Sequence, residues 1–110
     1  MIFITGGAYQ GKQRFVTDVL GIAPERALFN AHEYIAKALE NGEDAEILID
    51  GILSRGNIEA VTCNEIGMGI VPADSGERRR REVTGRIMCR FAERADMVYR
   101  LVCGIPVKIK

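Results

Sequence analysis

A glycine-rich turn that carries one lysine is the clearest chemical signal in this sequence. Residues 5–13 read TGGAYQGKQ and match the phosphate-binding pattern G-x-x-x-x-G-K-[ST] at Gly6, Gly11 and Lys12. In this pattern, backbone N–H groups surround the phosphates of a nucleotide and the lysine reaches the β- and γ-phosphates. The position after the lysine, which usually holds a magnesium-binding hydroxyl, is Gln13. The candidate nucleotide-binding residues are Gly6, Gly7, Ala8, Tyr9, Gln10, Gly11, Lys12 and Gln13.

Two other side chains are of types that catalyse reactions. Glu65 follows an apolar segment together with Asn64, and a carboxylate there can bind Mg²⁺ or orient an attacking hydroxyl. His32 is the single histidine and can serve as a nucleophile or a general acid–base. With Lys12 they form the candidate catalytic set, and Glu65 is the candidate metal ligand. The residue types do not exclude simpler roles. Lys12 can be a solvated lysine in a glycine turn, Glu65 a solvated glutamate and His32 a structural histidine.

Arginines are concentrated in one segment near the end of the chain. They are Arg78–Arg81, Arg86, Arg90 and Arg94. The four-residue steps predict a solvated helix face, partly paired with Glu82 and Glu93. The first arginines stand in a first helical turn, where cations oppose the helix dipole. They are therefore also candidates for binding an anionic substrate.

Apolar runs and helical periodicity predict the elements that hold these side chains. The predicted strands are residues 1–5, 26–30, 58–63, 97–103 and 105–110. The predicted helices run from Lys12 to Gly21, from Asn30 to Gly42 and from Asp44 to Gly56, and a long one follows Asp74. Asn30 with Glu33, and Asp74 with Glu77, have the spacing of a capping box.

Residues 45–53, AEILIDGIL, can be read as a strand or as a helix. Their apolar residues fall at helical spacing, which favours a helix that begins after Asp44 and leaves Asp50 at the surface. The long helix after Asp74 has one apolar face. That face carries Val83, Ile87, Met88, Phe91, Ala92 and Ala95.

The alternation of strands and helices predicts an α/β fold with a mostly parallel sheet covered on both faces. We expect one P-loop domain over residues 1–110, with three layers and a C-terminal edge strand. In open α/β sheets, ligands bind at the carboxyl ends of the strands. Residues 6–13 and 64–72 are the two loops with unusual residues at that edge.

The composition restricts the expected partners and surroundings. Among 110 residues, 15 are basic and 15 acidic, so neither nucleic acid nor a membrane surface is an expected partner. Cys63, Cys89 and Cys103 form no close pair and lie in apolar segments, which predicts three buried, reduced thiols. No signal peptide or long apolar run is evident, which predicts a cytoplasmic protein.

The segments TGGAYQGK and NEIGMGIVPADSGERRRREVTGRIMCRFAERADMVYRLVCGIPVKIK resemble the adenosylcobinamide kinase/adenosylcobinamide-phosphate guanylyltransferase family of cobalamin biosynthesis. That family has a GGARSGKS loop, an N-E-V-G-x-G-I-V-P segment and a C-terminal G-I-P-x-x-x-K. The resemblance covers about the first 15 and the last 50 residues. It implies a P-loop α/β transferase, commonly a trimer, so a homo-oligomer is an expected partner state.

The resemblance also implies substrates and site residues. Such enzymes use GTP or ATP to phosphorylate adenosylcobinamide, and then transfer GMP from GTP to that phosphate through a guanylylated histidine. Carried over, the phosphate loop keeps its glycines and Lys12, and the second motif keeps Asn64, Glu65, Gly67, Gly69 and Pro72.

The sequence departs from the family at positions that matter for catalysis. Gln13 replaces the Ser or Thr that binds Mg²⁺, and Tyr9-Gln10 replace Arg-Ser. The middle of the chain is shorter, without the stretch that leads to the guanylylated histidine and without the D-C-L-T strand. His32 can stand in for that histidine, whereas Asp50 matches D-C-L-T only against its helical periodicity.

Three hypotheses follow from these departures. The first is a nucleotide-binding transferase that phosphorylates or guanylylates a cobinamide. The second is a non-catalytic paralogue that binds a nucleotide or a corrinoid as a regulatory or assembly module. The third is a phosphate loop that has lost its ligand. Dependence of nucleotide binding on Mg²⁺ distinguishes the first two.

Overall fold

A five-stranded sheet forms the middle of the molecule in the computed structural model, which describes residues 1–66 and 74–110. The strands are β1 (Ile2–Gly6), β2 (Ala27–Leu28), β3 (Ala60–Asn64), β4 (Met97–Val102) and β5 (Ile105–Lys108). Their order in the sheet is β2-β3-β1-β4-β5, and β5 alone is antiparallel to its neighbour. The mostly parallel sheet with a C-terminal edge strand is therefore confirmed.

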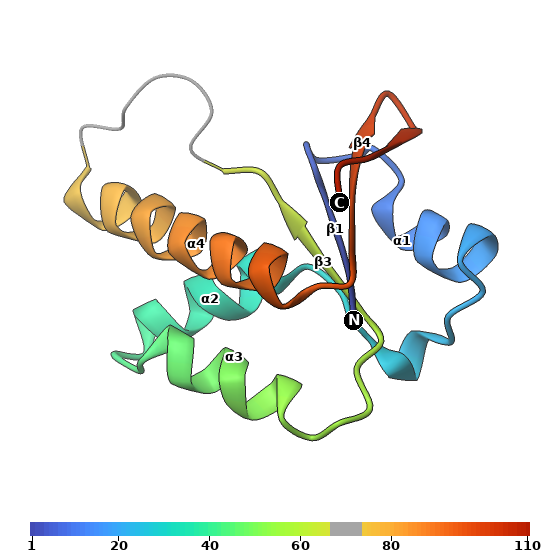
Figure 1. Cartoon of the computed structure of the whole chain (residues 1–110). Coiled ribbons are helices and arrows are strands. Elements are labelled where there is room, and N and C mark those ends of the chain that lie inside the picture. Colours follow the sequence, from blue (N-terminus) through green and yellow to red (C-terminus); the bar gives the residue numbers. More distant parts are fainter. Residues whose placement is uncertain (67–73) are drawn as a thin grey trace.

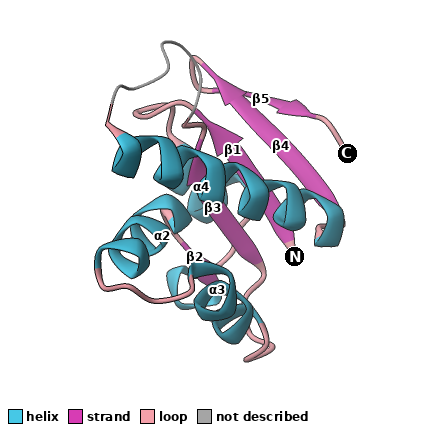
Figure 2. Ribbon diagram, turned by 90° about the vertical axis from the view of Figure 1, so that its left-hand side faces the viewer, coloured by secondary structure: helices cyan, strands magenta, loops and turns pink. Residues whose placement is uncertain are grey.

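Helices cover both faces of the sheet. They are α1 (Lys12–Arg14), its π-helical continuation Phe15–Val19, α2 (Ala31–Glu40), α3 (Ala45–Leu53) and α4 (Ser75–Arg94). One face packs against α2, α3 and α4, and the other against α1 and its continuation (Figures 1 and 2). These three layers confirm the P-loop NTPase-like α/β fold.

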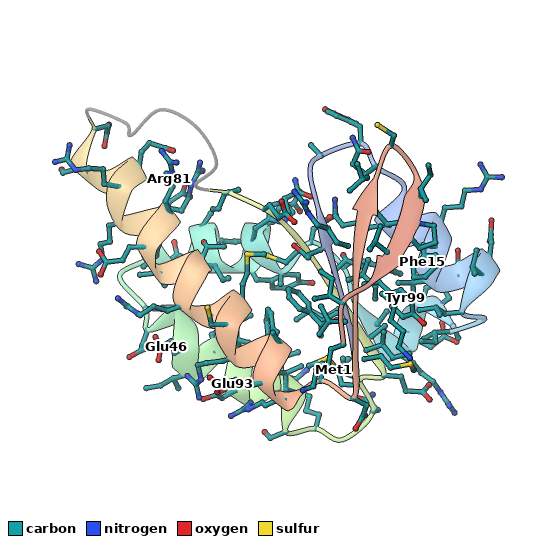
Figure 3. All side chains as sticks on the ribbon, turned by 45° about the horizontal axis from the view of Figure 1, so that its top comes forward. Met1, Phe15, Glu46, Arg81, Glu93 and Tyr99 are labelled. Atoms are coloured by element: carbon teal, nitrogen blue, oxygen red, sulfur yellow. The ribbon has the colours of Figure 1, made fainter. Side chains whose placement is uncertain are left out.

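Alternate residues of the strands supply the two cores. Phe3 points to the face of α4, where its ring lies 5.3 Å from that of Phe91, and both side chains are buried. On the other face, the ring centroids of Phe15 and Tyr99 are 5.2 Å apart. Figure 3 labels both side chains. The larger core therefore packs α4 against the central strand.

Local signals predicted two of the helix starts correctly. The Asp44 carboxylate accepts hydrogen bonds from the backbone N–H groups of Glu46 and Ile47, and thereby begins α3. Asp74 caps α4 in the same way, through the N–H groups of Gly76 and Glu77. A carboxylate at this position satisfies N–H groups that have no partner within the helix.

The capping box predicted at Asn30 is wrong. Asn30 lies in the left-handed region, at φ 57°, and its side chain makes no capping hydrogen bond. Its backbone N–H instead donates to the Thr62 hydroxyl of β3, at 2.8 Å. Strand β2 ends at Leu28, two residues earlier than predicted. The hydrogen bond to Thr62 fixes the backbone of Asn30 between β2 and α2.

The arginines of α4 lie on an exposed or half-exposed face, as predicted, but several of them also pair with acids of α3. Arg86 pairs with Glu82 as expected, but Arg86 and Arg90 also pair with Glu46 of α3. Arg90 and Arg94 both bind Asp50, at 2.9 and 3.1 Å. Asp50 is thus a surface residue engaged between two helices, and Glu46 lies on α3 beside α4 in Figure 3. We call this network the α3–α4 ion ladder.

The prediction of three buried thiols is wrong for two of them. Cys63 is buried in β3, whereas Cys89 and Cys103 are exposed. Cys89 lies outside the buried stripe of α4, and Cys103 forms the β4–β5 turn at φ 51°. No helix among the described residues is both long and apolar enough to cross a membrane.

Candidate functional site

The two loops predicted to carry chemistry meet at the carboxyl edge of the sheet. Strands β1 and β3 are parallel neighbours, with Gly6 opposite Asn64. Just past the strands, the backbone N–H of Glu65 donates to the carbonyl oxygen of Gly6, at 2.8 Å. The phosphate-loop pattern and Glu65 are therefore adjacent. Of the second motif, Gly67, Gly69 and Pro72 lie outside the described residues.

The glycine loop has the backbone that its sequence requires. A Cβ on Gly6 would lie 2.6 Å from the carbonyl oxygen of Leu101, so no other residue fits there. Gly11 begins α1 in the left-handed region, at φ 81°, and the fully exposed Tyr9 is left-handed as well. Apart from Gln10, which closes the turn at Ala8–Tyr9, the backbone N–H groups of residues 7–14 have no hydrogen-bond acceptor within the described chain. Such a series of unpaired donors is what an anion-binding loop presents.

Lys12 is folded back over its own loop. Its Nζ donates to the carbonyl oxygen of Gly7, at 2.6 Å, and the residue is only 6% exposed. Burial lowers its pKa, while the nearby Cys63 and Glu65 act in the opposite direction. A phosphate oxygen that replaced the Gly7 carbonyl would give this buried ammonium a charged partner.

Glu65 is engaged by a residue that the sequence analysis missed. Arg100 of β4 binds both carboxylate oxygens, from Nε to Oε1 at 2.8 Å and from Nη2 to Oε2 at 3.1 Å. The hydrogen bond and charge of Glu65 raise the pKa of Arg100, so the guanidinium stays protonated. The signal in the sequence was a lone arginine inside the apolar strand MVYRLV. Only the parallel register, which places Arg100 beside Thr5 of β1, gives that arginine a partner.

The arranged residues do not fit a magnesium ion. Both oxygens of Glu65 are occupied by Arg100, and Gln13 is exposed with no hydroxyl to offer. The described residues also contain no cluster of three or more His, Cys, Asp or Glu side chains that could hold a metal. A metal role for Glu65 stays a prediction, and in this arrangement the metal would have to share the carboxylate with the cationic Arg100.

His32 lies beside the same edge, at the start of α2. Its Nδ1 accepts the backbone N–H of Asn64, at 3.1 Å. Burial lowers the pKa of His32 despite Glu33, and the cations Lys12 and Arg80 lower it further. The ring is therefore neutral near pH 7, and its proton resides on Nε2. In this arrangement His32 offers a hydrogen-bond donor to a ligand, while neither nitrogen has a lone pair available for attack.

Comparison with known proteins identifies relatives over part of the chain. The sequence profile described as "Cobinamide kinase / cobinamide phosphate guanyltransferase" matches residues 44–109. This range includes Glu65 and Arg100, whereas Lys12 and His32 precede it.

Two curated proteins are similar to this chain. The "Bifunctional adenosylcobalamin biosynthesis protein CobU" of Salmonella typhimurium (strain LT2) is 37% identical over 78 residues, which is 71% of this chain and 43% of that protein. The protein of the same name from Escherichia coli (strain K12) is 38% identical over 80 residues, 71% of this chain and 44% of its own length. The chain therefore spans less than half the length of these relatives. Since the family profile matches more than half of the chain, the chain belongs to the cobinamide kinase / cobinamide phosphate guanyltransferase family.

Proposed function

We propose that this chain binds the triphosphate of GTP or ATP at residues 6–13 and acts on a cobinamide in cobalamin biosynthesis. The observation that carries the proposal is the row of N–H groups at residues 7–14, most of which have no acceptor in the described part of the chain, beside the buried Lys12. Membership of the family supplies the chemistry, which is transfer of a phosphoryl or guanylyl group. Phosphoryl transfer to a hydroxyl oxygen of adenosylcobinamide would release the nucleoside diphosphate, and guanylyl transfer from GTP to an oxygen of its phosphate would release pyrophosphate.

Each side chain of the edge has a distinct role in this proposal. The loop N–H groups bind phosphate oxygens, and Lys12 exchanges the Gly7 carbonyl for an oxygen of the β- or γ-phosphate. His32 donates from Nε2 to the bound anion. Glu65 is the only carboxylate of this set, and as a base it would accept the proton of the attacking hydroxyl.

The second candidate, a nucleotide-binding protein without turnover, is favoured by one observation. Both oxygens of Glu65 accept hydrogen bonds from Arg100, so the carboxylate that would serve as the base is already engaged in an ion pair. An assay separates the two candidates: the chain is incubated with adenosylcobinamide and labelled GTP or ATP, and label on the corrinoid is measured. Labelled corrinoid supports the transferase, and nucleotide binding without labelled corrinoid supports the alternative.

Substitution of Lys12 tests the nucleotide site itself. Lys12→Met keeps the length of the side chain and removes its charge, so we expect affinity for a non-hydrolysable GTP or ATP analogue to fall by about tenfold or more. Titration calorimetry measures the change. Lys37→Met, at an exposed position of α2, is the matched control and should bind as the wild type does. Equal affinity of the Lys12 variant and the wild type would contradict the proposed site.

A further inference from the structure

We propose that this site binds its polyphosphate without a divalent cation, and that Arg100 supplies the positive charge that a metal would otherwise provide. The proposal rests on the nucleotide site proposed above. It arises from the disagreement between the residues present and the magnesium site expected of the family's loop. Gln13 replaces the hydroxyl that would bind the metal, and the second candidate ligand, the Glu65 carboxylate, is bound to Arg100.

Arg100 is positioned to reach an anion held by the loop. Leu101 is paired with Gly6, the last residue of β1 before the loop. Arg100 is paired with Thr5 and is therefore one residue further from the loop. The Glu65 carboxylate that holds Arg100 is itself adjacent to the loop, through the hydrogen bond to Gly6. The side chain of Arg100 is 43% exposed, whereas that of Glu65 is 17% exposed. The guanidinium thus covers the carboxylate and faces the solvent from which a ligand arrives.

The guanidinium retains donors for a ligand. Glu65 takes one N–H from Nε and one from Nη2, and Arg100 has no other hydrogen-bond partner among the described residues. The remaining N–H groups form a planar fork that suits phosphate oxygens. Arg100 can therefore bind a phosphate while it keeps Glu65, with no exchange of partners.

A buried hydroxyl supports the same reading. Thr5 is the β1 neighbour of both Arg100 and Cys63, and it is 7% exposed. Its Oγ1 has no hydrogen-bond partner in the described part of the chain. A buried polar atom without a partner is costly, and a ligand or water bound beside Arg100 is the kind of group that satisfies it.

The charges at the edge favour an anion over a cation. Lys12 and Arg100 are positive, and Glu65 alone is negative, so the three together carry a net positive charge. A magnesium ion at Glu65 would have to share the carboxylate with Arg100 and lie beside its positive charge. A phosphate meets no such obstacle.

Titration calorimetry with a non-hydrolysable GTP or ATP analogue tests the proposal. The wild type is measured in EDTA and again in excess Mg²⁺. We expect the two dissociation constants to agree within about threefold. Binding that requires Mg²⁺ would overturn the inference and leave the nucleotide site standing. No binding in either buffer would overturn the nucleotide site, and this inference with it.

Three variants determine whether Arg100 is responsible. In EDTA, Arg100→Gln should weaken binding by about tenfold or more, because a charge-assisted contact is lost. Glu65→Gln should bind at least as tightly as the wild type in both buffers, since it removes the negative charge beside the anion. Arg26→Gln is the matched control, because Arg26 also forms a pair with a glutamate, Glu59, just before β2 and β3 at the opposite edge of the sheet.

The variants have outcomes that contradict the inference. If Glu65→Gln weakens binding in Mg²⁺ and not in EDTA, Glu65 is a metal ligand and the inference is wrong. If Arg100→Gln binds in EDTA as Arg26→Gln does, Arg100 does not contact the ligand. Arg100→Lys guards against misfolding: it keeps the charge without the planar fork, and its affinity should lie between those of the wild type and Arg100→Gln.

Discussion

Hydrogen bonds from other elements decide what His32 and Glu65 can do. Both residues belong to types that catalyse many reactions, yet each is engaged by a neighbour from another element. The Asn64 N–H occupies Nδ1 of His32, and Arg100 occupies both oxygens of Glu65. The first contact turns a potential nucleophile into a donor, and the second turns a potential metal ligand into half of an ion pair.

The lowered pKa of His32 predicts a pH dependence of stability. As the pH falls through the ordinary histidine pKa of about 6.5, the unfolded chain binds a proton that the folded chain resists. The free energy of unfolding therefore decreases with falling pH, and the decrease levels off below the folded-state pKa. His32→Asn keeps an acceptor for the Asn64 N–H but does not titrate, so it should lose less stability between pH 8 and pH 5.

Thermal or urea unfolding of the two proteins at several pH values measures this difference. The difference in free energy of unfolding between the two proteins should be constant near pH 8, where His32 is neutral in both the folded and the unfolded chain, and should change as the pH falls through about 6.5. Unfolding curves that shift in parallel for the wild type and His32→Asn over the whole range would contradict the assignment.

At the scale of elements, the packing of α3 against α4 explains the spacing of the arginines. Four-residue steps on α4 and the pair Glu46 and Asp50 on α3 have the same helical repeat, so the charges alternate along the contact. Below this α3–α4 ion ladder, Ile49 and Ile87 are both nearly fully buried. The ladder covers the outer side of a contact whose inner side is apolar.

Asp50→Asn should destabilise the protein by about 1 kcal/mol at low salt, because it weakens two half-exposed ion pairs that belong to one network. Urea unfolding at low and at high salt measures the loss, which should shrink as salt screens the charges. Glu40→Gln, exposed on α2 and outside the ladder, is the control and should change stability little. A loss of equal size at high salt would point to packing instead of charge.

At the scale of the whole molecule, the order of the strands assembles the candidate site. Strand β1 lies between β3 and β4, although β3 follows it by more than 50 residues and β4 by more than 90. The loop after β1 is therefore next to Glu65 and Arg100 at the same edge. Figure 1 shows this central position of β1, with helices on either side.

Thiol reactivity reports on the integrity of this arrangement. Burial raises the pKa of Cys63 to about 12, so at pH 8 it stays protonated and inaccessible inside the folded sheet. We expect a disulfide reagent to modify Cys89 and Cys103 rapidly and Cys63 only after denaturation. Thiol counting before and after addition of urea tests this, with Cys63→Ala as the control. Rapid reaction of all three native thiols would mean that β3 is not buried as described.

The local parts of the fold were predictable from the sequence. Apolar runs placed the strands, and carboxylates at Asp44 and Asp74 began the helices, because these signals act within a few residues. The predicted start at Asn30 failed, since a hydrogen bond to Thr62, far away in the sequence, sets its backbone. The arginines of α4 were assigned to solvent because their partners lie on another helix.

The sequence by itself determined the fold class and the family, and it identified candidate residues for phosphate binding. A glycine turn with a lysine between a strand and a helix needs only local geometry, and its pattern is visible in one stretch of chain. Only the tertiary structure decided how those residues are engaged. Arg100 meets Glu65, and Asn64 meets His32, because parallel strands and a helix bring together residues more than 30 positions apart. Such contacts depend on register, which no local pattern contains.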